Sequence, residues 1–386
     1  MLFDFGRRLR NGMAHPLFTS FKLRSIEFSN RIGVSPMCQY SSEDGFANDW
    51  HLVHLGCRAQ GGAALVMLEA SAVVPEGRIS PQDLGIWKDQ HIPNLERIVR
   101  FIHSQGARAG IQLAHAGRKA STQSPFLGHG AVSTAEGGWQ PVAPSAIAFA
   151  PEYPMPRELD QAGIDATIGA FREGALRALR TGFDLIEVHA AHGYLLHEFL
   201  SPLANHRSDA YGGSFENRTR LLLQVADSVR AVWPDHLPLF VRISATDWAA
   251  GGWTPDESVE LARHLKARGV DLVDVSSGGQ IPTAQVPVGP GYQVPFAARI
   301  RREAGIPTAA VGMITEPKQA NAIVEAGEAD LVVLAREMLR DPNWPLHAAI
   351  ALNEQTSWPV QYLRAAPHHS LPRAPLHVEP LHAKKA

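Results

Sequence analysis

The sequence predicts an α/β protein built as a single (β/α)₈ barrel. Two observations carry this prediction: short, nearly continuous apolar runs alternate eight times with helical patterns, and 386 residues suffice for one such barrel. Parallel strands that are covered on both faces have continuous apolar runs, and they need helical crossovers. Eight such units favour closure, because a closed sheet has no exposed edges.

The predicted strands are short and bounded by polar or glycine-rich segments. They cover residues 31–37, 64–71, 108–117, 184–191, 238–247, 271–279, 307–313 and 330–337.

The predicted helices follow these strands, and several begin at a residue that caps helices well. Ser214 stands at such a position, and so does Thr254, which precedes Pro255 at the first helical position. A doubly wound sheet is the alternative fold, but no G-x-G-x-x-G run follows any predicted strand. The helices cover residues 49–61, 91–105, 160–181, 215–232, 255–268, 293–304 and 316–326.

Three segments fall outside the repeat. Residues 118–158 are rich in Pro, Gly, Ser and Ala and are too long for a simple connection, so we expect a lid over the barrel mouth. Residues 365–386 are polar and interrupted by prolines, which predicts a disordered tail. Residues 1–16 lack the apolar core of a signal peptide and are expected to form a flexible extension, which leaves 17–364 for the barrel.

The composition argues against several classes of function. A formal net charge of −2 gives no electrostatic footprint for nucleic acid. The two cysteines, Cys38 and Cys57, provide neither a disulfide framework nor a four-cysteine metal site. No apolar run reaches the roughly 18–20 residues that span a membrane. A cytoplasmic protein is therefore expected.

Residues with useful chemistry gather at the carboxyl ends of the predicted strands, the face on which barrel active sites are built. Each residue alone is weak evidence for an active site, but all of them lie at the same end of the predicted barrel. They are Pro36, Met37, Cys38, Gln39 and Tyr40 after the first strand, Glu69 and Ala70 at the second, Gln112, His115, Arg118 and Lys119 in and after the third, His189, His192 and Tyr194 at the fourth, Arg242 in the fifth, and Ala335 and Arg336 at the eighth.

The two histidines of the fourth strand end admit three interpretations. They could be packed in the core, they could bind a metal with His197 as a third ligand, or they could be neutral donors to a substrate oxygen. Tyr194 follows them and carries a proton that a phenol can deliver to carbon. Donors beside an acid suit the reduction of an activated double bond.

Such a reduction needs an electron carrier, because no side chain transfers hydride. A flavin mononucleotide (FMN) would require an anion site for its phosphate. The Ala335-Arg336 step provides a cation, and Gly312 and the glycines of residues 276–279 allow close backbone approach.

Further residues match the ring of a flavin. Arg242 could stabilise the negative charge of a reduced flavin while Gln112 binds the ring edge; the alternative for Arg242 is an ion pair with Glu69 or Asp274. Cys38 near the mouth could adjust the flavin potential through a weak S–H contact, or it could be an ordinary buried cysteine.

Taken together, these residues resemble the Old Yellow Enzyme family of flavin-dependent ene-reductases, in its thermophilic-like branch. The resemblance covers about residues 17–364. It implies non-covalent FMN at the barrel mouth, reduction of FMN by NADPH, and reduction of an α,β-unsaturated carbonyl, imide or nitro compound in the same place. It rests on the runs SPMCQYSSEDG, NDWHLVHLG, EASAVVPEGRIS, IQLAHAGRKAS, VHAAHGYLLHEFLSPLANHRSDAYGGSFENRTR and DPNWP.

The resemblance implies a role for each matched residue. His189 and His192 would hold the activating oxygen of the substrate, Tyr194 would donate the proton, Tyr40 would contact the substrate and Lys119 would lie near the flavin. The residues that would hold FMN are Ser35, Pro36, Met37, Cys38, Ala70, Gln112, Arg242, Gly312, Ala335 and Arg336.

Two further implications concern Cys38 and Arg364. Cys38 matches a cysteine that modulates flavin reactivity in this branch. Arg364 would enter the active site of a neighbouring subunit in a homodimer or homotetramer, although the chain continues through residues 365–386 beyond it.

Two alternative functions remain at this stage. A metal-dependent barrel hydrolase would use His189, His192 and His197 as ligands, and a non-catalytic protein would bind flavin without being reduced by NADPH.

Overall fold

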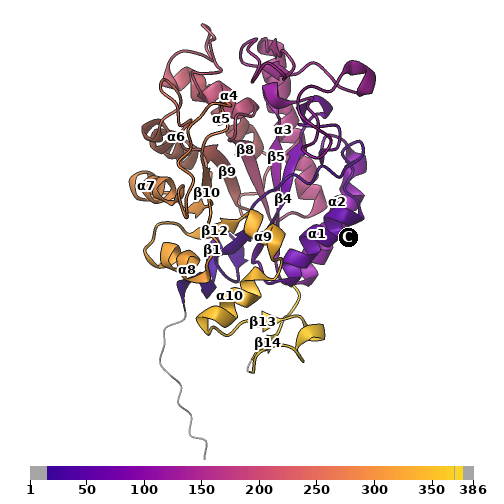
Figure 1. The fold of residues 1–386 in the computed structure, drawn as a ribbon, viewed down its shortest axis with the longest axis vertical. Helices are drawn as coiled ribbons and strands as arrows, with labels where there is room; N and C mark the ends of the chain where they lie inside the picture. Colours follow the sequence, from indigo (N-terminus) through magenta and orange to yellow (C-terminus); the bar gives the residue numbers. More distant parts are fainter. Residues whose placement is uncertain (1–14, 369, 377–386) are drawn as a thin grey trace, which may run out of the picture.

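Eight parallel strands close into a barrel, in which hydrogen-bonded neighbours follow the order β10-β11-β12-β3-β4-β5-β8-β9 (Figure 1). The computed structural model describes residues 15–368 and 370–376. The predicted barrel and all of its predicted strands are confirmed. The strands are β3 (Ile32–Val34), β4 (Leu65–Ala72), β5 (Arg108–Ala114), β8 (Leu185–Ala190), β9 (Leu239–Ser244), β10 (Leu272–Ser276), β11 (Thr308–Ala310) and β12 (Leu331–Leu334).

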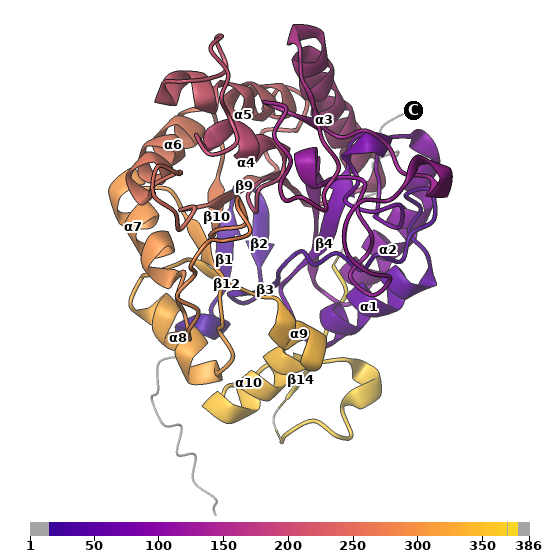
Figure 2. The same cartoon turned by 45° about the horizontal axis from the view of Figure 1, so that its top comes forward.

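A ring of helices surrounds the strands (Figure 2). Thr254 accepts a hydrogen bond from the backbone N–H of Glu257, and Ser214 accepts one from Asn217, so the caps that the sequence predicts are formed. No helix of the described residues is long and apolar enough to cross a membrane. The predicted helices are α1 (Asp49–Gln60), α2 (Ile92–Ser104), α3 (Gln161–Thr181), α5 (Phe215–Arg230), α6 (Pro255–Ala267), α7 (Val294–Ala304) and α8 (Pro317–Glu325).

Three helices were not predicted. They are α4 (Leu195–Leu200), α9 (Arg336–Arg340) and α10 (Trp344–Leu352). α4 and α9 are too short to show a helical period, and α10 is apolar around its circumference, so its sequence has no polar face. α9 begins at the end of the last predicted strand, which therefore stops earlier than expected.

The lower half of the barrel interior is an apolar plug. Leu65, Leu185 and Phe240 point into it from three strands and are fully buried. An antiparallel hairpin, β1 (Phe21–Leu23) and β2 (Ile26–Phe28), packs against this plug where the barrel strands begin. The hairpin alternates in burial, so that Phe28 is covered while Glu27 is exposed. The plug leaves only the opposite end of the barrel for a site.

Residues 118–158 have little regular structure, in agreement with their composition. They contain only the short pieces η5 (Thr134–Glu136), β6 (Val142–Ala143) and β7 (Arg157–Glu158). Arg118 fixes the start of the segment, because it is buried and its Nη2 donates to the carbonyl of Gln280 at 2.7 Å. The function of the segment as a lid stays a prediction.

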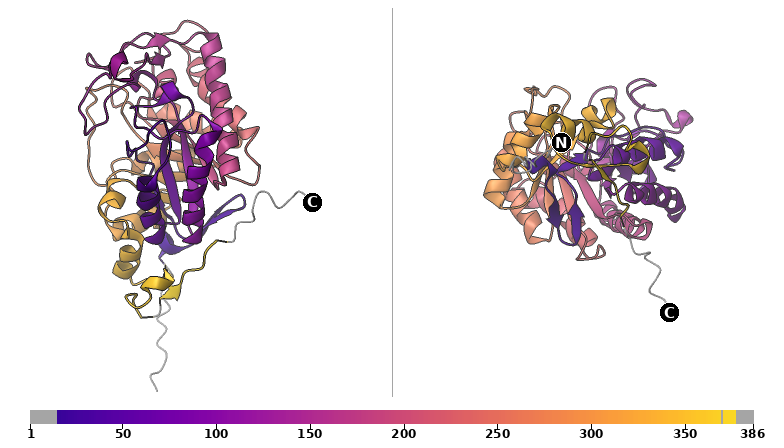
Figure 3. Two further views of the ribbon diagram at one scale, coloured as in Figure 1. Left: turned by 90° about the vertical axis from the view of Figure 1, so that its right-hand side faces the viewer. Right: turned by 90° about the horizontal axis from the view of Figure 1, so that it is seen from below.

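The C-terminal segment is ordered for longer than its composition suggests. β14 (Leu371–Pro372) pairs with β13 (Ser357–Trp358) at the end of the barrel opposite the site (Figure 3). The guanidinium of Arg373 donates to the carbonyls of Ala59 and Gln60, at 2.9 and 2.7 Å, and so caps the end of α1. The expected disorder therefore does not hold for residues 370–376, because these long-range bonds cannot be recognised from composition.

The structure describes the two terminal segments that the sequence predicts, 1–16 and 365–386, only in part. Residues 1–14, 369 and 377–386 lie outside the described residues. His15, placed in the flexible extension by the sequence, is held by Glu354, whose Oε1 accepts from its backbone N–H at 2.6 Å.

The plug generates a prediction about stability. Replacing Phe28 by Ala removes a fully buried ring from the hairpin, and we expect the free energy of unfolding to fall by about 3–5 kcal/mol. Glu27→Ala on the exposed face of the same strand should change it by less than about 0.5 kcal/mol. Urea unfolding of both variants measures the difference, and equal values would show that the hairpin does not seal the barrel.

Candidate active site

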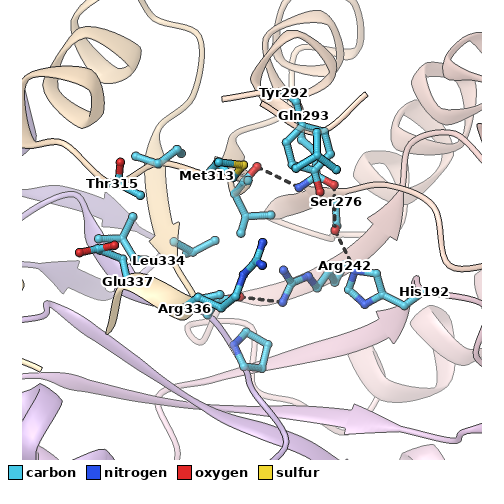
Figure 4. Close-up of a pocket in the computed structure, with 18 of the residues that line it drawn as sticks. His192, Arg242, Ser276, Tyr292, Gln293, Met313, Thr315, Leu334, Arg336 and Glu337 are labelled. Carbon is cyan, nitrogen blue, oxygen red and sulfur yellow. Dashed lines mark hydrogen bonds between the residues drawn. The ribbon is translucent and has the colours of Figure 1, made fainter. Parts of the chain in front are cut away.

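A cavity of about 580 Å³ opens at the carboxyl ends of the strands, a size typical of sites for small molecules and cofactors. His192, Arg242 and Ser276 line one side, while Met313, Thr315 and Glu337 line the other (Figure 4). The structure brings seven of the predicted site residues to this cavity: Ser35, Pro36, His192, Arg242, Gly312, Ala335 and Arg336.

Arg242 is buried on β9 and held from two sides. Its Nη1 donates to the hydroxyl of Ser35 at 2.9 Å, and its Nε lies 3.4 Å from Oδ2 of Asp274 on the adjacent strand β10. The ion-pair interpretation of Arg242 is therefore correct, and the side chain also lines the cavity, while its contact with a flavin stays a prediction. Glu69 is not that partner; it binds the ring of His51 at 3.1 Å.

Gln112 does not line this cavity and lies deeper in the barrel. It is 2% exposed, and its amide Nε2 donates to Oε1 of Glu187 at 2.7 Å. The two residues are direct neighbours on β5 and β8. Glu187 was not predicted as a site residue. A carboxylate inside the apolar run DLIEVHAA was a signal that could have identified it.

The residues at the end of β8 form one group of rings. The ring centroid of His189 lies 5.2 Å from that of His192 and 5.2 Å from that of Tyr194. Nε2 of His192 is 2.7 Å from the hydroxyl of Ser276. His189, His192 and Tyr194 therefore lie together, as the sequence predicts.

Both imidazoles are uncharged at neutral pH. Burial lowers the pKa of His189 and of His192 well below the ordinary value, and the positive charge of Arg242 lowers both further. Burial also raises the pKa of Tyr194, so its phenol keeps its proton. The group therefore consists of neutral hydrogen-bond donors beside a protonated phenol.

His197 does not join this group, which removes the third ligand of the metal alternative. Its ring is fully buried, with Nε2 3.0 Å from Oδ1 of Asp247 and Nδ1 accepting from the backbone N–H of Gly193 at 2.8 Å. Both nitrogens are thus engaged in positioning the loop that carries His192 and Tyr194. Among residues 15–368 and 370–376, no group of three or more His, Cys, Asp or Glu side chains could hold a metal ion.

Lys119 fixes the same loop from the other side. Its ammonium donates to the backbone carbonyl of His192 at 2.7 Å and to that of Gly279, and it lies 4.1 Å from the ring centroid of Phe149. Burial, followed by the charge of Arg118, lowers the pKa of Lys119 to about 7. The lysine therefore lies beside the ring group, on the side of the segment 118–158.

Some predicted site residues lie away from the main cavity. Ala70 and Tyr194 line a smaller space together with Asp83. Cys38 is half-buried, and burial followed by the nearby Asp83 and Glu69 raises the pKa of its thiol. The predicted roles of Ala70 and Cys38 in binding FMN stay predictions.

Three more predicted residues also lie outside the cavity lining. Tyr40 makes an edge contact with Phe126 at 5.8 Å between ring centroids, and Met37 packs against the core between strands and helices. Arg364 is exposed on the segment that follows α10. The predicted roles of these residues stay predictions.

Several residues that complete the cavity wall were not predicted from the sequence. Gln293 donates through Nε2 to the carbonyl of Val311 at 3.0 Å and accepts from the hydroxyl of Ser277 at 2.6 Å. Tyr292 and Met313 belong to the same wall. These residues come from loops without a recognisable motif, and only the fold brings them together.

The cavity has the features that FMN requires. Arg336 and Arg340 supply cations at one wall, and Gly312 (φ 120°) exposes its backbone there. The positive φ of Gly312 favours glycine, and a Cβ there would also lie 2.8 Å from Nε2 of Gln293. Nδ1 of His189 is a buried ring nitrogen without a hydrogen-bond partner among the described residues. Cations, open backbone and an unused polar atom suit a phosphate-bearing flavin.

Comparison with known proteins identifies close relatives. The chain is 50% identical over 350 residues to an NADPH dehydrogenase of Geobacillus thermodenitrificans, which covers 90% of this chain and 98% of the relative. It is 49% identical over 355 residues to an NADPH dehydrogenase of Halalkalibacterium halodurans, which covers 92% and 99%.

Solved structures agree with this result. Morphinone reductase superposes with a TM-score of 0.75 at 27% identity, covering 88% of this chain and 90% of that one. A 2-naphthoyl-CoA reductase superposes with a TM-score of 0.79 at 26% identity over 89% of this chain, which spans only 53% of that longer protein.

A family model settles the assignment. The model described as the NADH:flavin oxidoreductase / NADH oxidase family matches residues 16–355. This match confirms the flavin-dependent oxidoreductase that the sequence motifs predicted. The chain belongs to the NADH:flavin oxidoreductase / NADH oxidase family, and FMN is the cofactor of this family.

Proposed function

We propose that this oxidoreductase is an ene-reductase that uses NADPH to reduce the C=C bond of α,β-unsaturated carbonyl, imide or nitro compounds. The observation that carries the proposal is the group of two neutral imidazoles and a protonated phenol, His189, His192 and Tyr194, beside the cavity. The relatives named NADPH dehydrogenase support NADPH as the reductant.

Residues of the cavity wall and of its immediate surroundings would hold FMN by charge and by hydrogen bonds. Arg242 and Gln112 would bind the ring, and Arg336 would bind the phosphate beside the backbone of Gly312. Bound FMN would supply the hydride chemistry that no side chain can perform. The other residues proposed to contact it are Ser35, Pro36, Met37, Cys38, Ala70 and Ala335.

The ring group would activate and protonate the substrate. Neutral imidazole N–H groups of His189 and His192 would donate to the carbonyl or nitro oxygen and draw electron density from the double bond. Tyr194 would deliver its proton to the carbon next to the activating group. Tyr40 would contact the substrate near this phenol.

The assembly and location of the enzyme are part of the same proposal. We place it in the cytoplasm as a homodimer or homotetramer, in which Arg364 of one subunit contacts the substrate in its neighbour. A non-catalytic flavin-binding protein is the remaining alternative, and it would bind FMN that NADPH does not reduce.

Separate measurement of the two half-reactions tests the function. The FMN-loaded protein should be yellow, lose its colour on anaerobic addition of NADPH, and regain it when 2-cyclohexenone is added. Tyr194→Phe should keep the first step and slow the second by about 10²–10⁴-fold, because it removes only the proton donor. Stopped-flow absorbance follows both steps.

Two results would contradict the proposal. A protein that takes up no FMN, or whose FMN stays oxidised with NADPH, is not an NADPH-dependent ene-reductase. An equal loss of both half-reactions in Tyr194→Phe would show that the phenol is not the proton donor.

The neutral histidines also predict the pH dependence. Because the pKa of each imidazole is lowered by burial and by Arg242, the rings become charged only in acid, below the ordinary range of histidine. The rate of the 2-cyclohexenone step should therefore show no histidine titration between about pH 6 and 8. A sigmoidal change of this rate centred near pH 6.5, absent in His192→Asn, would show that His192 is not held neutral in this range.

A further inference from the structure

Two acidic side chains lie in contact inside the barrel, below the proposed ring site. Glu187 on β8 and Asp274 on β10 are 1% and 2% exposed. Their carboxyl groups lie within hydrogen-bonding reach of each other. The nearest cation is Arg242, whose Nε lies 3.4 Å from Oδ2 of Asp274.

This contact requires a proton. A carboxylate only accepts hydrogen bonds, so two ionised carboxylates cannot bond to each other. Away from water, their like charges would also repel strongly, and a single guanidinium cannot balance both. Oδ1 of Asp274 has no N–H or O–H donor in the described part of the chain, and a proton on the Glu187 carboxyl would provide one.

The position of Arg242 indicates which group is protonated. Arg242 forms its ion pair with Asp274 and so favours the ionised form of that residue. Burial, and then the negative charge of Asp274, raises the pKa of Glu187 well above its ordinary value. Burial also raises the pKa of Asp274, but the adjacent Arg242 opposes that shift. The proton therefore belongs to Glu187 at neutral pH.

We propose that Glu187 is a neutral carboxylic acid that positions Gln112, an inference that rests on the proposed contact of Gln112 and Arg242 with FMN. Its O–H donates to Asp274, and its Oε1 accepts from the amide of Gln112 at 2.7 Å. The amide nitrogen of Gln112 is thereby held toward Glu187, which leaves its carbonyl oxygen free for a donor on the flavin ring.

The protonation state also sets the charge beneath the cofactor. With Glu187 neutral, Arg242 and Asp274 sum to zero, whereas an ionised Glu187 would make the cluster −1. A buried negative charge at this place would oppose the negative charge that a flavin acquires on reduction. The shared proton thus keeps the site suited to accept electrons.

Glu187→Gln tests the inference, because the amide can replace both hydrogen bonds of a neutral acid. We expect its FMN dissociation constant to stay within about twofold of wild type and its FMN midpoint potential to be unchanged. Glu187→Ala removes the acceptor for Gln112 and should weaken FMN binding by about tenfold. Flavin fluorescence titration and spectroelectrochemistry give these values, and thermal unfolding checks that both variants fold.

Infrared spectroscopy provides a direct readout. The pKa values of the buried Glu198 and Asp83 are also raised, to about 8 and about 7, so the readout is the difference between the wild-type and Glu187→Gln spectra at pH 7. This difference should contain the C=O band of one protonated carboxyl group. Absence of the band from the difference spectrum, or a higher midpoint potential in Glu187→Gln, would show that Glu187 is ionised. The band can be recorded without FMN, so a protein that binds no flavin would refute the proposed function and still test Glu187.

Discussion

The site depends on one buried ion pair, between Arg242 and Asp274 on adjacent strands. A guanidinium inside a barrel is costly unless its charge is paired and its N–H groups are bonded, and breaking such a pair costs roughly 3–5 kcal/mol. Ser35 accepts a further hydrogen bond from it at 2.9 Å. Burial, and then the same charge, lowers the pKa of both imidazoles at the end of β8, so the guanidinium helps to keep these hydrogen-bond donors neutral.

The barrel interior is arranged in layers that explain this position. The apolar plug closes the lower end, and a polar layer containing Gln112, Glu187, Arg242 and Asp274 lies above it. The ring group lies beyond this layer, at the carboxyl ends of the strands. Because side chains of a strand alternate between its two faces, every second residue points inward, and each layer receives its residues from several strands. The proposed binding and proton-donating residues are therefore carried by the strands of the barrel or by the loops directly after them.

Much of the fold was predictable from the sequence, since each barrel strand is a continuous apolar run followed by a helix. The clustering of His189, His192 and Tyr194 was predictable as well, because all three follow one strand. Contacts between distant strands were not. The contact between Glu187 and Asp274 depends on how β8, β9 and β10 lie relative to one another. The cap that Arg373 forms on α1 joins residues more than 300 positions apart. No local pattern records either contact.

A crystal structure of the FMN complex would show whether these residues form the flavin site. We expect the flavin ring to lie in the cavity, with its pyrimidine edge at Arg242 and Gln112 and its phosphate beside Arg336 and Gly312. We also expect His189, His192 and Tyr194 to face the open side of the ring. Flavin bound elsewhere, or imidazoles that point into the apolar core while FMN occupies the cavity, would contradict this arrangement.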